Sequence, residues 1–368
     1  MSDNKNFINQ TMLTCLGNKR KLVNEISKLI KSIGKTLNSE KMKIVDGFSG
    51  STVVSRKLLE DAYEIHSNDM EHYAYLMAEC FMKKPSKEDQ TAIKTYIDSM
   101  NNLAKNGPYK EGIISQLYAP KNTFDIKEGE RVFYTRENAL IIDTLRTYIT
   151  MVVPKRLQVY CLVPLLTRGS IHANTAGVFK GFYKDGKVGK FGGAGENALE
   201  RITKPIRLDM PIWSDSEATV YCYNKDINVL INDLPEDIDI IYLDPPYNQH
   251  PYGSNYFMLN VIAKYEMPEQ ISRVSGIPKN WKRSKYNSRN SAVGSMKNLL
   301  ESAFKKTKYV ILSYNDEGII KKSDWDEIFE NYNVEKKEIS YDTYKGSRNL
   351  KNRSNKVMEI MYVITMRK

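Results

Sequence analysis

Residues 238–257, "IDIIYLDPPYNQHPYGSNYF", decide the fold, because a short apolar run stops abruptly there at Asp244. A run of this length that ends in a proline-rich turn is typical of a buried strand. Pro245 and Pro246 each fix a backbone φ angle, and a residue that precedes proline is held extended. We therefore predict a strand whose carboxyl end holds two aimed hydrogen-bond acceptors, the Asp244 side chain and the Pro245 carbonyl.

Predicted strands and helices alternate on both sides of this segment. "KIVDGF" (43–48) predicts a strand that enters the turn "SGST" and then the helix "VVSRKLLEDAY" (53–63). "EIHSND" (64–69) predicts a second strand, followed by the helix "EHYAYLMAECFMKK" (71–84). Four later segments predict strands of the same sheet: "ATVYCYNKD" (218–226), "KYVILSYND" (308–316), "EKKEISYD" (335–342) and "VMEIMYVITM" (357–366). Such alternation is typical of an α/β domain with a mostly parallel sheet.

The alternation stops between residues 86 and 214. Lys-rich helical segments lie there beside a stretch rich in Gly, Lys and amides, "RGSIHANTAGVFKGFYKDGKVGKFGGAGENA" (168–198). We interpret 86–214 as an inserted domain, and 1–85 together with 215–368 as one split α/β domain.

The composition favours a nucleic-acid partner. The formal net charge of +11 should attract a polyanion. The four cysteines form no C-x-x-C pair, which argues against a zinc site or a disulfide framework and favours a reducing cytosol. The four histidines lack ligand spacing, so we expect no metal. The apolar runs are too short to span a membrane, and we expect no membrane association.

The first two predicted strands each end beside an acidic residue, at the sheet edge where α/β proteins bind ligands. Asp46 opens the turn "DGFSGST", in which Gly47 and Gly50 would let backbone N–H groups approach a ligand closely. No Lys-Ser/Thr pair follows, which argues against a triphosphate-binding loop. Asp69 stands where an acidic residue would bind ribose hydroxyls. Either feature alone is more often a turn with a helix cap, but together they predict a ligand that carries a ribose.

The two acceptors at the "DPPY" turn suit an exocyclic amine of a nucleobase. Accepting hydrogen bonds from both amine hydrogens would favour a more tetrahedral and more nucleophilic nitrogen. Tyr247 would offer an aromatic face on which the base could stack. A base inside a duplex is out of reach, so the target must be flipped out or arrive single-stranded.

Four stretches, taken in order along the chain, resemble the motifs of one enzyme family. They are "CLGNKRKL" (15–22), "DGFSGST" (46–52), "NDM" (68–70) and "DPPY" (244–247). Together they resemble the D12-class, Dam-like (α-group) DNA adenine-N6 methyltransferases, including members of restriction-modification systems. The resemblance implies a Rossmann-like methyltransferase sheet, S-adenosylmethionine as cofactor and methylation of adenine in double-stranded DNA. Cys15, Asn18 and Thr52 depart from the family's usual Trp, Gly and Gly.

The resemblance also implies roles for individual residues. It assigns catalysis to Asp244, Pro245, Pro246 and Tyr247, and cofactor binding to Cys15, Gly17, Lys19, Asp46, Phe48, Gly50, Asp69, Asp226, Ile227 and Asp244. The implied reaction is an in-line displacement in which the target nitrogen attacks the methyl group. The chain has no Pro-Cys dipeptide of the kind that a cytosine-C5 enzyme uses for its nucleophile.

Several basic residues are expected to contact DNA. Residues 271–299 contain seven Lys or Arg and no acidic residue, and Trp281 and Tyr286 add aromatic faces, which favours phosphate contacts over a solvated charged loop. The resemblance places the target-recognition domain within 86–214, where Asn and Lys side chains could read base edges, although a glycine-rich hairpin with structural duties is equally compatible. The predicted DNA contacts are Asn174, Thr175, Lys180, Tyr256, Lys282, Arg283, Lys285 and Arg348.

Other functions share parts of this pattern. Cytosine N4 or an rRNA base amine would suit the same acceptor pair, but the full motif order and the large insertion favour DNA adenine. A non-catalytic DNA-binding regulator on this fold would be expected to have lost the "DPPY" or ribose-binding acids, and both are present. We expect a cytoplasmic enzyme of a bacterium or phage, with double-stranded DNA as partner and a cognate restriction endonuclease as a further candidate partner.

Overall fold

The computed structural model describes Phe7, Ile8, Leu13, Gly17 and residues 19–193, 195–342 and 356–367. Cys15, Asn18 and Arg348, with the other residues of 343–355, lie outside the described residues.

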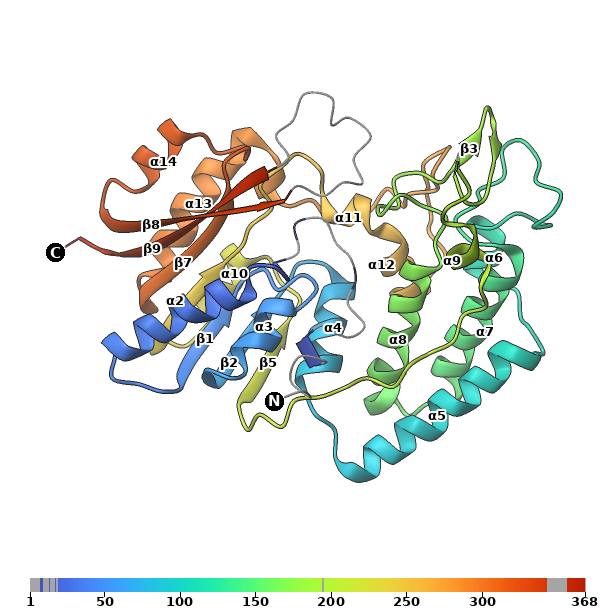
Figure 1. Ribbon diagram of the computed structural model, residues 1–368, viewed down its shortest axis with the longest axis horizontal. Coiled ribbons are helices and arrows are strands. Elements are labelled where there is room, and N and C mark those ends of the chain that lie inside the picture. Colours follow the sequence, from blue (N-terminus) through green and yellow to red (C-terminus); the bar gives the residue numbers. More distant parts are fainter. Residues whose placement is uncertain are drawn as a thin grey trace.

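A seven-stranded sheet forms the centre of the α/β part of the molecule (Figure 1). In spatial order its strands are β5 (Thr219–Tyr223), β2 (Ala62–Asn68), β1 (Met42–Asp46), β6 (Ile238–Leu243), β7 (Thr307–Asn315), β9 (Lys356–Met366) and β8 (Tyr332–Asp342). Neighbouring strands are parallel except that β9 runs antiparallel to both β7 and β8. The mostly parallel α/β sheet predicted from the sequence is therefore confirmed, and all seven strands predicted in 1–85 and 215–368 belong to it.

The strand order reverses between β1 and β6. From β1 the chain adds β2 and then β5 on one side, whereas β6 and β7 lie on the other. A reversal of this kind opens a crevice at the carboxyl ends of the two strands, which is where ligands bind in open α/β sheets. Asp46 ends β1 and Asp244 directly follows β6, so both lie at this crevice.

Successive residues of each central strand face opposite sides of the sheet, because side chains alternate along a strand. Ile44 and Ile240 belong to a core shared with helices α2 (Val23–Thr36) and α3 (Val53–Leu58). Val45 and Ile241 belong to a second core. That core is shared with helices α10 (Ile227–Asp233), α13 (Arg289–Ala303) and α14 (Lys322–Ile328). Near-continuous apolar strands are thus explained by burial on both faces.

The helix predicted over 53–63 is shorter than expected. It ends at Leu58, and residues 62–68 form β2. The Met42 N–H donates to the Asp61 carbonyl, which draws the chain into the sheet before the helical pattern ends. The next helix, α4 (His72–Met82), lies within its predicted range.

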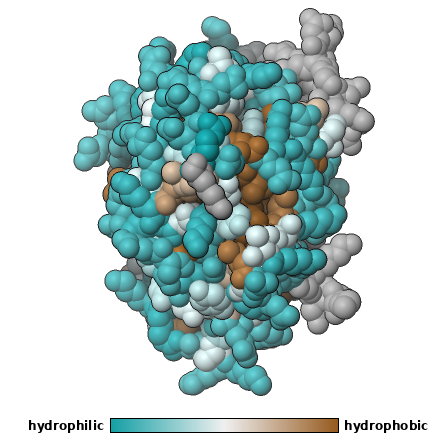
Figure 2. Space-filling model, turned by 90° about the vertical axis from the view of Figure 1, so that its left-hand side faces the viewer, coloured by the Kyte–Doolittle hydropathy of each residue, from teal (hydrophilic) through white to brown (hydrophobic). Residues whose placement is uncertain are grey.

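The edge strand β8 is protected by charge. Glu335, Lys336 and Glu338 are exposed on it, and charged side chains oppose pairing with a further strand. Figure 2 views the molecule from this side and shows a mostly hydrophilic surface with a narrow hydrophobic strip.

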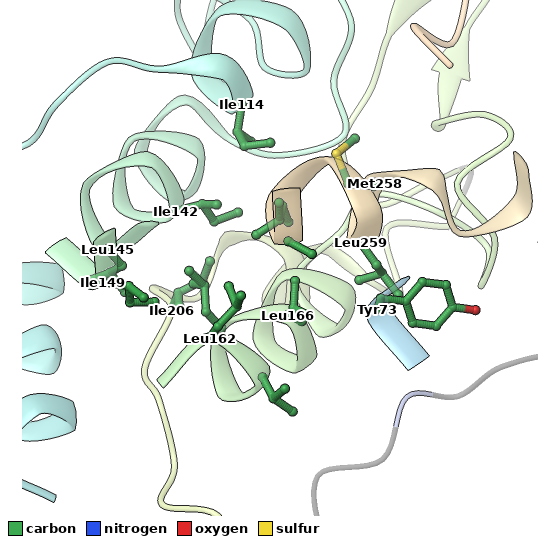
Figure 3. Packing of buried hydrophobic residues seen from close by; sticks show 14 of the residues in the cluster. Tyr73, Ile114, Ile142, Leu145, Ile149, Leu162, Leu166, Ile206, Met258 and Leu259 are labelled. Carbon is green, nitrogen blue, oxygen red and sulfur yellow. The ribbon is translucent and has the colours of Figure 1, made fainter. Parts of the chain in front are cut away.

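A helical lobe lies beside the sheet. Its elements are α5 (Lys87–Asn106), α6 (Ile113–Leu117), α7 (Arg136–Val152), η1 (Lys155–Leu157), α8 (Gln158–Ile171), the hairpin β3 (Lys184–Asp185) and β4 (Val188–Gly189), and α9 (Leu199–Thr203). The core of this lobe also takes residues from α4 and from α12 (Phe257–Lys264). Figure 3 shows Met258 and Leu259 of α12 packed among residues of α7 and α8 such as Ile142 and Leu166. The helical lobe therefore shares its core with segments that precede and follow it in the chain.

Candidate active site

One cleft opens at the carboxyl edge of the sheet, over the reversal between β1 and β6. It encloses about 960 Å³ of space including its open mouth, a size suited to a small-molecule ligand. The predicted site residues that line it are Gly17, Lys19, Phe48, Gly50, Asp69, Asp226, Ile227, Asp244, Pro246 and Lys282. Residues that are far apart in the sequence, from Gly17 to Lys282, thus meet at one place.

The turn after β1 holds its shape through two residues with positive φ. Gly50 has a φ of +49°, and its N–H donates to Asp69 Oδ2 at 2.8 Å. Thr52 has a φ of +64° although it is not glycine, and its N–H donates to the Ser49 carbonyl at 2.6 Å. A β-branched residue in this region is strained, and such strain is held only where neighbouring contacts enforce it. The departure from glycine at position 52 therefore keeps the tight turn.

Asp69 is positioned by two backbone donors. Besides the bond from Gly50, its Oδ1 accepts from the Glu71 N–H at 2.7 Å. Burial raises the pKa of Asp69, and these backbone bonds oppose the rise. A carboxylate offers about four acceptor positions, so Asp69 retains acceptor capacity for a ligand in the cleft.

Glu71 lies beside Asp69 in the same cleft and was missed from the sequence. It accepts a hydrogen bond from Asn260 Nδ2 at 2.7 Å. Burial and then the charge of Asp69 raise the pKa of Glu71 to about 7. The sequence signal for Glu71 was its position two residues after Asp69 in "NDMEHY".

Asp46 lies deeper than the residues that line the cleft. It was predicted as a cofactor contact, but its side chain is fully buried and accepts from Ser55 Oγ at 2.5 Å beneath the turn. Burial raises its pKa to about 7. Asp46 therefore supports the turn from below and lies outside the cleft lining.

An apolar slot forms one wall of the cleft. Phe48 meets the ring of Tyr286 edge to face, with ring centroids 5.4 Å apart, and Ile227 lies beside them in the cleft lining. Asp226 caps α10 by accepting from the Asn228 N–H at 2.9 Å. Tyr286 was predicted as an aromatic face for DNA, but it is only 2% exposed and donates its hydroxyl to Asn228 at 2.7 Å. It is a wall residue of the cleft.

The "DPPY" turn opens into the same cleft. Pro245 is buried, Asp244 and Pro246 line the cleft, and Tyr247 is partly exposed. The Tyr247 ring packs edge to face on Tyr314 with centroids 6.2 Å apart, and its carbonyl accepts from Ile319 N–H at 2.8 Å. The aromatic face of Tyr247 is therefore fixed beside Asp244.

Lys19 connects Asp244 to a residue that was missed from the sequence. Its ammonium lies 2.8 Å from Asp244 Oδ1 and 3.0 Å from Glu359 Oε1. The pKa of Lys19 lies well above its ordinary value. Burial alone would lower this pKa, but the charges of Asp244 and Glu359 raise it by more. Burial also raises the pKa of Asp244, to about 6, with Lys19 opposing the rise. The only signal for Glu359 was a single acid inside the apolar strand "VMEIMYVITM".

Gly17 is expected to be intolerant of a side chain. Its φ is +76°, and a Cβ atom would lie 3.0 Å from the Tyr247 hydroxyl and 3.1 Å from the Tyr252 hydroxyl. Gly17→Ala should therefore displace Tyr247 and lower kcat by about 10- to 100-fold, since small misplacements near reacting atoms are costly. The check is steady-state kinetics beside Gly129→Ala, where φ is +91° but no atom lies within 4 Å of the new Cβ. Equal losses in both variants would refute a local clash at Gly17.

Three predicted DNA contacts are buried, which corrects their assignment. Asn174 is fully buried, donates to the carbonyls of Val132 and Lys190 at 2.9 and 3.0 Å, and accepts from the Gly192 N–H. Thr175 is 7% exposed and Tyr256 is 2% exposed. Asn174 therefore secures the β3–β4 hairpin, because its polar atoms are already used within the protein.

Lys180, Lys282, Arg283 and Lys285, the other predicted DNA contacts that the structure describes, lie at the surface. Lys282 donates to the Met70 carbonyl at 2.9 Å and lines the cleft. Arg283 stacks on Trp281 with its guanidinium 4.5 Å from the ring centroid. Lys285 begins the short helix η2 (Lys285–Asn287), and Lys180 is exposed near the hairpin.

Metal-binding clusters and membrane-spanning helices can be assessed for the part of the chain that the structure describes. In that part, no three His, Cys, Asp or Glu side chains gather in a way that would hold a metal ion. None of its helices combines the length and the apolar character needed to cross a membrane.

Comparison with known proteins gives a consistent set of relatives. A family model described as D12 class N6 adenine-specific DNA methyltransferase matches residues 16–328. The Type II methyltransferase M.NlaIII of Neisseria lactamica is 28% identical over 366 residues, which cover 95% of this chain and 98% of that protein. The Type II methyltransferase M.CviAII of Paramecium bursaria Chlorella virus 1 is 28% identical, with 84% and 85% covered. Modification methylase StsI of Streptococcus sanguinis is 27% identical, with 95% of this chain and 51% of that protein covered.

Proposed function

The chain belongs to the D12 class of N6 adenine-specific DNA methyltransferases, and from this membership we propose that it transfers the methyl group of S-adenosylmethionine to N6 of an adenine flipped out of double-stranded DNA. The observation that carries the proposal is one cleft in which Asp244 and Pro246 of the "DPPY" turn meet the ribose-binding candidate Asp69 at the strand-order reversal. Relatives named as Type II methyltransferases support a role in protecting host DNA within a restriction-modification system.

The donor set of the cleft fits S-adenosylmethionine. Asp69 offers two oriented carboxylate oxygens for a ribose diol, and Phe48 with Ile227 offers an apolar slot for an adenine ring. Asp226, at the start of α10, offers an acceptor beside that slot. When bound, the cofactor would supply an electrophilic methyl group.

The "DPPY" residues have the placement needed to act on the target amine. The Asp244 carboxylate and the Pro245 carbonyl are held rigidly at the end of β6 and would accept the two amine hydrogens. Tyr247, fixed by Tyr314, would stack on the extruded base. Positioning and the exclusion of water are therefore the main contributions that we assign to the protein.

Mass spectrometry of nucleosides tests the proposal directly. The purified protein is incubated with S-adenosylmethionine and unmethylated plasmid DNA, and N6-methyladenine is the expected product. N4-methylcytosine would retain the acceptor chemistry and refute the adenine assignment. A lack of product on DNA would refute the DNA substrate, and activity on ribosomal RNA would then identify the alternative. The absence of a methylated product on every nucleic acid tested would favour a non-catalytic binding protein.

The basic segment after the catalytic turn is proposed to contact DNA phosphates. Arg283 and Lys285 are exposed, and residues 271–299 contain no acidic residue. Arg283→Ala with Lys285→Ala should weaken DNA binding and reduce the slope of log Kd against log salt by about 2, because each lost phosphate contact removes about one unit. Binding is measured by fluorescence anisotropy at several salt concentrations.

Lys305→Ala with Lys308→Ala provides the matched control. Both lysines are exposed, and they lie at the amino end of β7, the end of the sheet opposite the cleft. An unchanged salt slope in the Arg283 and Lys285 double variant would show that residues 271–299 do not contact DNA. An equal change in the control variant would lead to the same conclusion.

We further propose a cytoplasmic setting and a cognate restriction endonuclease that reads the same DNA site. Both rest on the relatives' names as modification enzymes. Digestion of methylated and unmethylated plasmid by a nuclease encoded beside the gene would test the partnership.

A further inference from the structure

A buried ion network lies behind the "DPPY" turn. Lys19 is 3% exposed and Glu359 is fully buried, so their contact excludes water. Glu359 Oε1 also accepts from Ser313 Oγ at 2.5 Å, which fixes the carboxylate from β7. Lys19 thus bridges Asp244, at the end of β6, and Glu359, on β9.

The sheet register brings Glu359 to this place. β9 runs antiparallel to β7, and Glu359 pairs with Asn315 at the carboxyl end of β7. A carboxylate buried in an apolar strand is costly unless it is paired. Lys19 supplies that pairing, and it joins Glu359 to the residue that would accept the target amine.

A cation shared between two carboxylates binds each less completely than it would bind either alone. If Lys19 paired with Asp244 only, the ammonium would occupy that carboxylate and make it a weaker acceptor. Glu359 draws part of the Lys19 interaction away and fixes the ammonium to one side of Asp244. The second Asp244 oxygen is then left for the substrate.

We propose that Glu359 is a positioning residue for methyl transfer, acting through Lys19 to keep Asp244 oriented and available as an acceptor. The inference rests on the proposed function, because it concerns how the same site treats the target amine. Glu359 does not line the cleft, and its effect on the reaction passes through the Lys19 ammonium.

The pH dependence of the reaction should reflect the contact of Lys19 with both Asp244 and Glu359. The titratable groups that face Asp244 are Lys19, Asp46, Tyr242, Tyr247, Tyr252 and Glu359. The pKa of Asp244 is about 6, and only the ionised carboxylate can accept freely, so kcat/KM should fall as pH drops through this value. The charge of Glu359 is one cause of the raised Asp244 pKa.

Glu359→Gln tests the proposal. Loss of a like charge should lower the Asp244 pKa, so the acid limb of kcat/KM should move to lower pH. At neutral pH, kcat should fall by about 10- to 100-fold because the Lys19 ammonium loses its anchor, while KM for S-adenosylmethionine changes little. Lys19→Met should move the acid limb to higher pH, since Asp244 then loses its cation.

The matched control is Glu338→Gln. Glu338 lies opposite Ile360 on the neighbouring strand, but it is exposed and pairs with Lys336. It should leave both rate and pH profile unchanged. The positioning role would be overturned if the acid limb of kcat/KM did not shift in Glu359→Gln. It would also be overturned if weaker cofactor binding explained the whole loss of activity.

The double variant Lys19→Met, Glu359→Gln gives a second criterion. If Glu359 acts through Lys19, the Glu359 change should cost no further activity once Lys19 is absent, whereas additive losses would overturn the proposal. If Glu359→Gln fails to fold, Ser313→Ala loosens the same carboxylate but keeps its charge, so kcat should fall while the acid limb stays in place. Carboxylate NMR titration of Asp244 measures the shift without turnover, so failure of the network is distinguished from failure of the proposed reaction.

Discussion

Replacement of Asp244 by Ala should reduce methyl transfer by at least about 10³-fold while the protein stays folded and binds S-adenosylmethionine within a few-fold of wild type. The carboxylate is the candidate acceptor for the target amine, and no other described carboxylate lies on the "DPPY" turn. The fold should tolerate the change, because Lys19 keeps Glu359 as a partner at 3.0 Å and is not left as a lone buried charge. Single-turnover kinetics with radiolabelled cofactor measures the chemical step directly.

Two comparisons make this result interpretable. Asp233→Ala, which removes an exposed carboxylate paired with Lys225, should behave as wild type. Asp244→Asn keeps the size of the side chain but replaces one acceptor oxygen by a donor, so it too should be severely impaired. Turnover close to wild type in Asp244→Ala would refute the catalytic assignment. Parallel loss of cofactor binding would assign Asp244 to the cofactor site instead.

Replacement of Asp69 by Ala should weaken S-adenosylmethionine binding by about 10- to 100-fold, the loss expected for hydrogen bonds to a charged group. The same carboxylate secures the Gly50 turn through the bond at 2.8 Å, so the variant loses a ligand contact and a support of the turn. Isothermal titration calorimetry measures the affinity. At saturating cofactor, kcat should recover to within a few-fold, because Asp69 lies away from the reacting amine.

Asp69→Asn provides the graded control for this effect. The amide retains one acceptor oxygen and nearly the same volume, so its cofactor affinity should fall between those of wild type and the Ala variant. A dissociation constant unchanged in Asp69→Ala would exclude Asp69 from the ribose site. A loss of kcat that persists at saturating cofactor would contradict the separation between Asp69 and the chemistry at Asp244.

Local sequence patterns were sufficient to predict the strands, the fold class and the position of Asp69 and Asp244 at the carboxyl edge of the sheet. Buried strands such as 238–243 are recognised in the sequence as apolar runs. The residues that end these strands are followed by turns rich in Gly or Pro, which have strong conformational preferences. Asp244 and Asp69 could be placed at the same sheet edge because parallel strands present their carboxyl ends together. These inferences needed only short stretches of chain.

Which residues become neighbours was decided only by the tertiary structure. Glu359 meets Lys19 because β9 inserts between β7 and β8, and no local pattern specifies that order. The same limit explains the errors, since Asn174 and Tyr256 have polar groups suited to bases but are enclosed by packing around the helical lobe. Local periodicity is set by contacts with near neighbours in sequence, whereas burial and ion pairing depend on how distant segments pack.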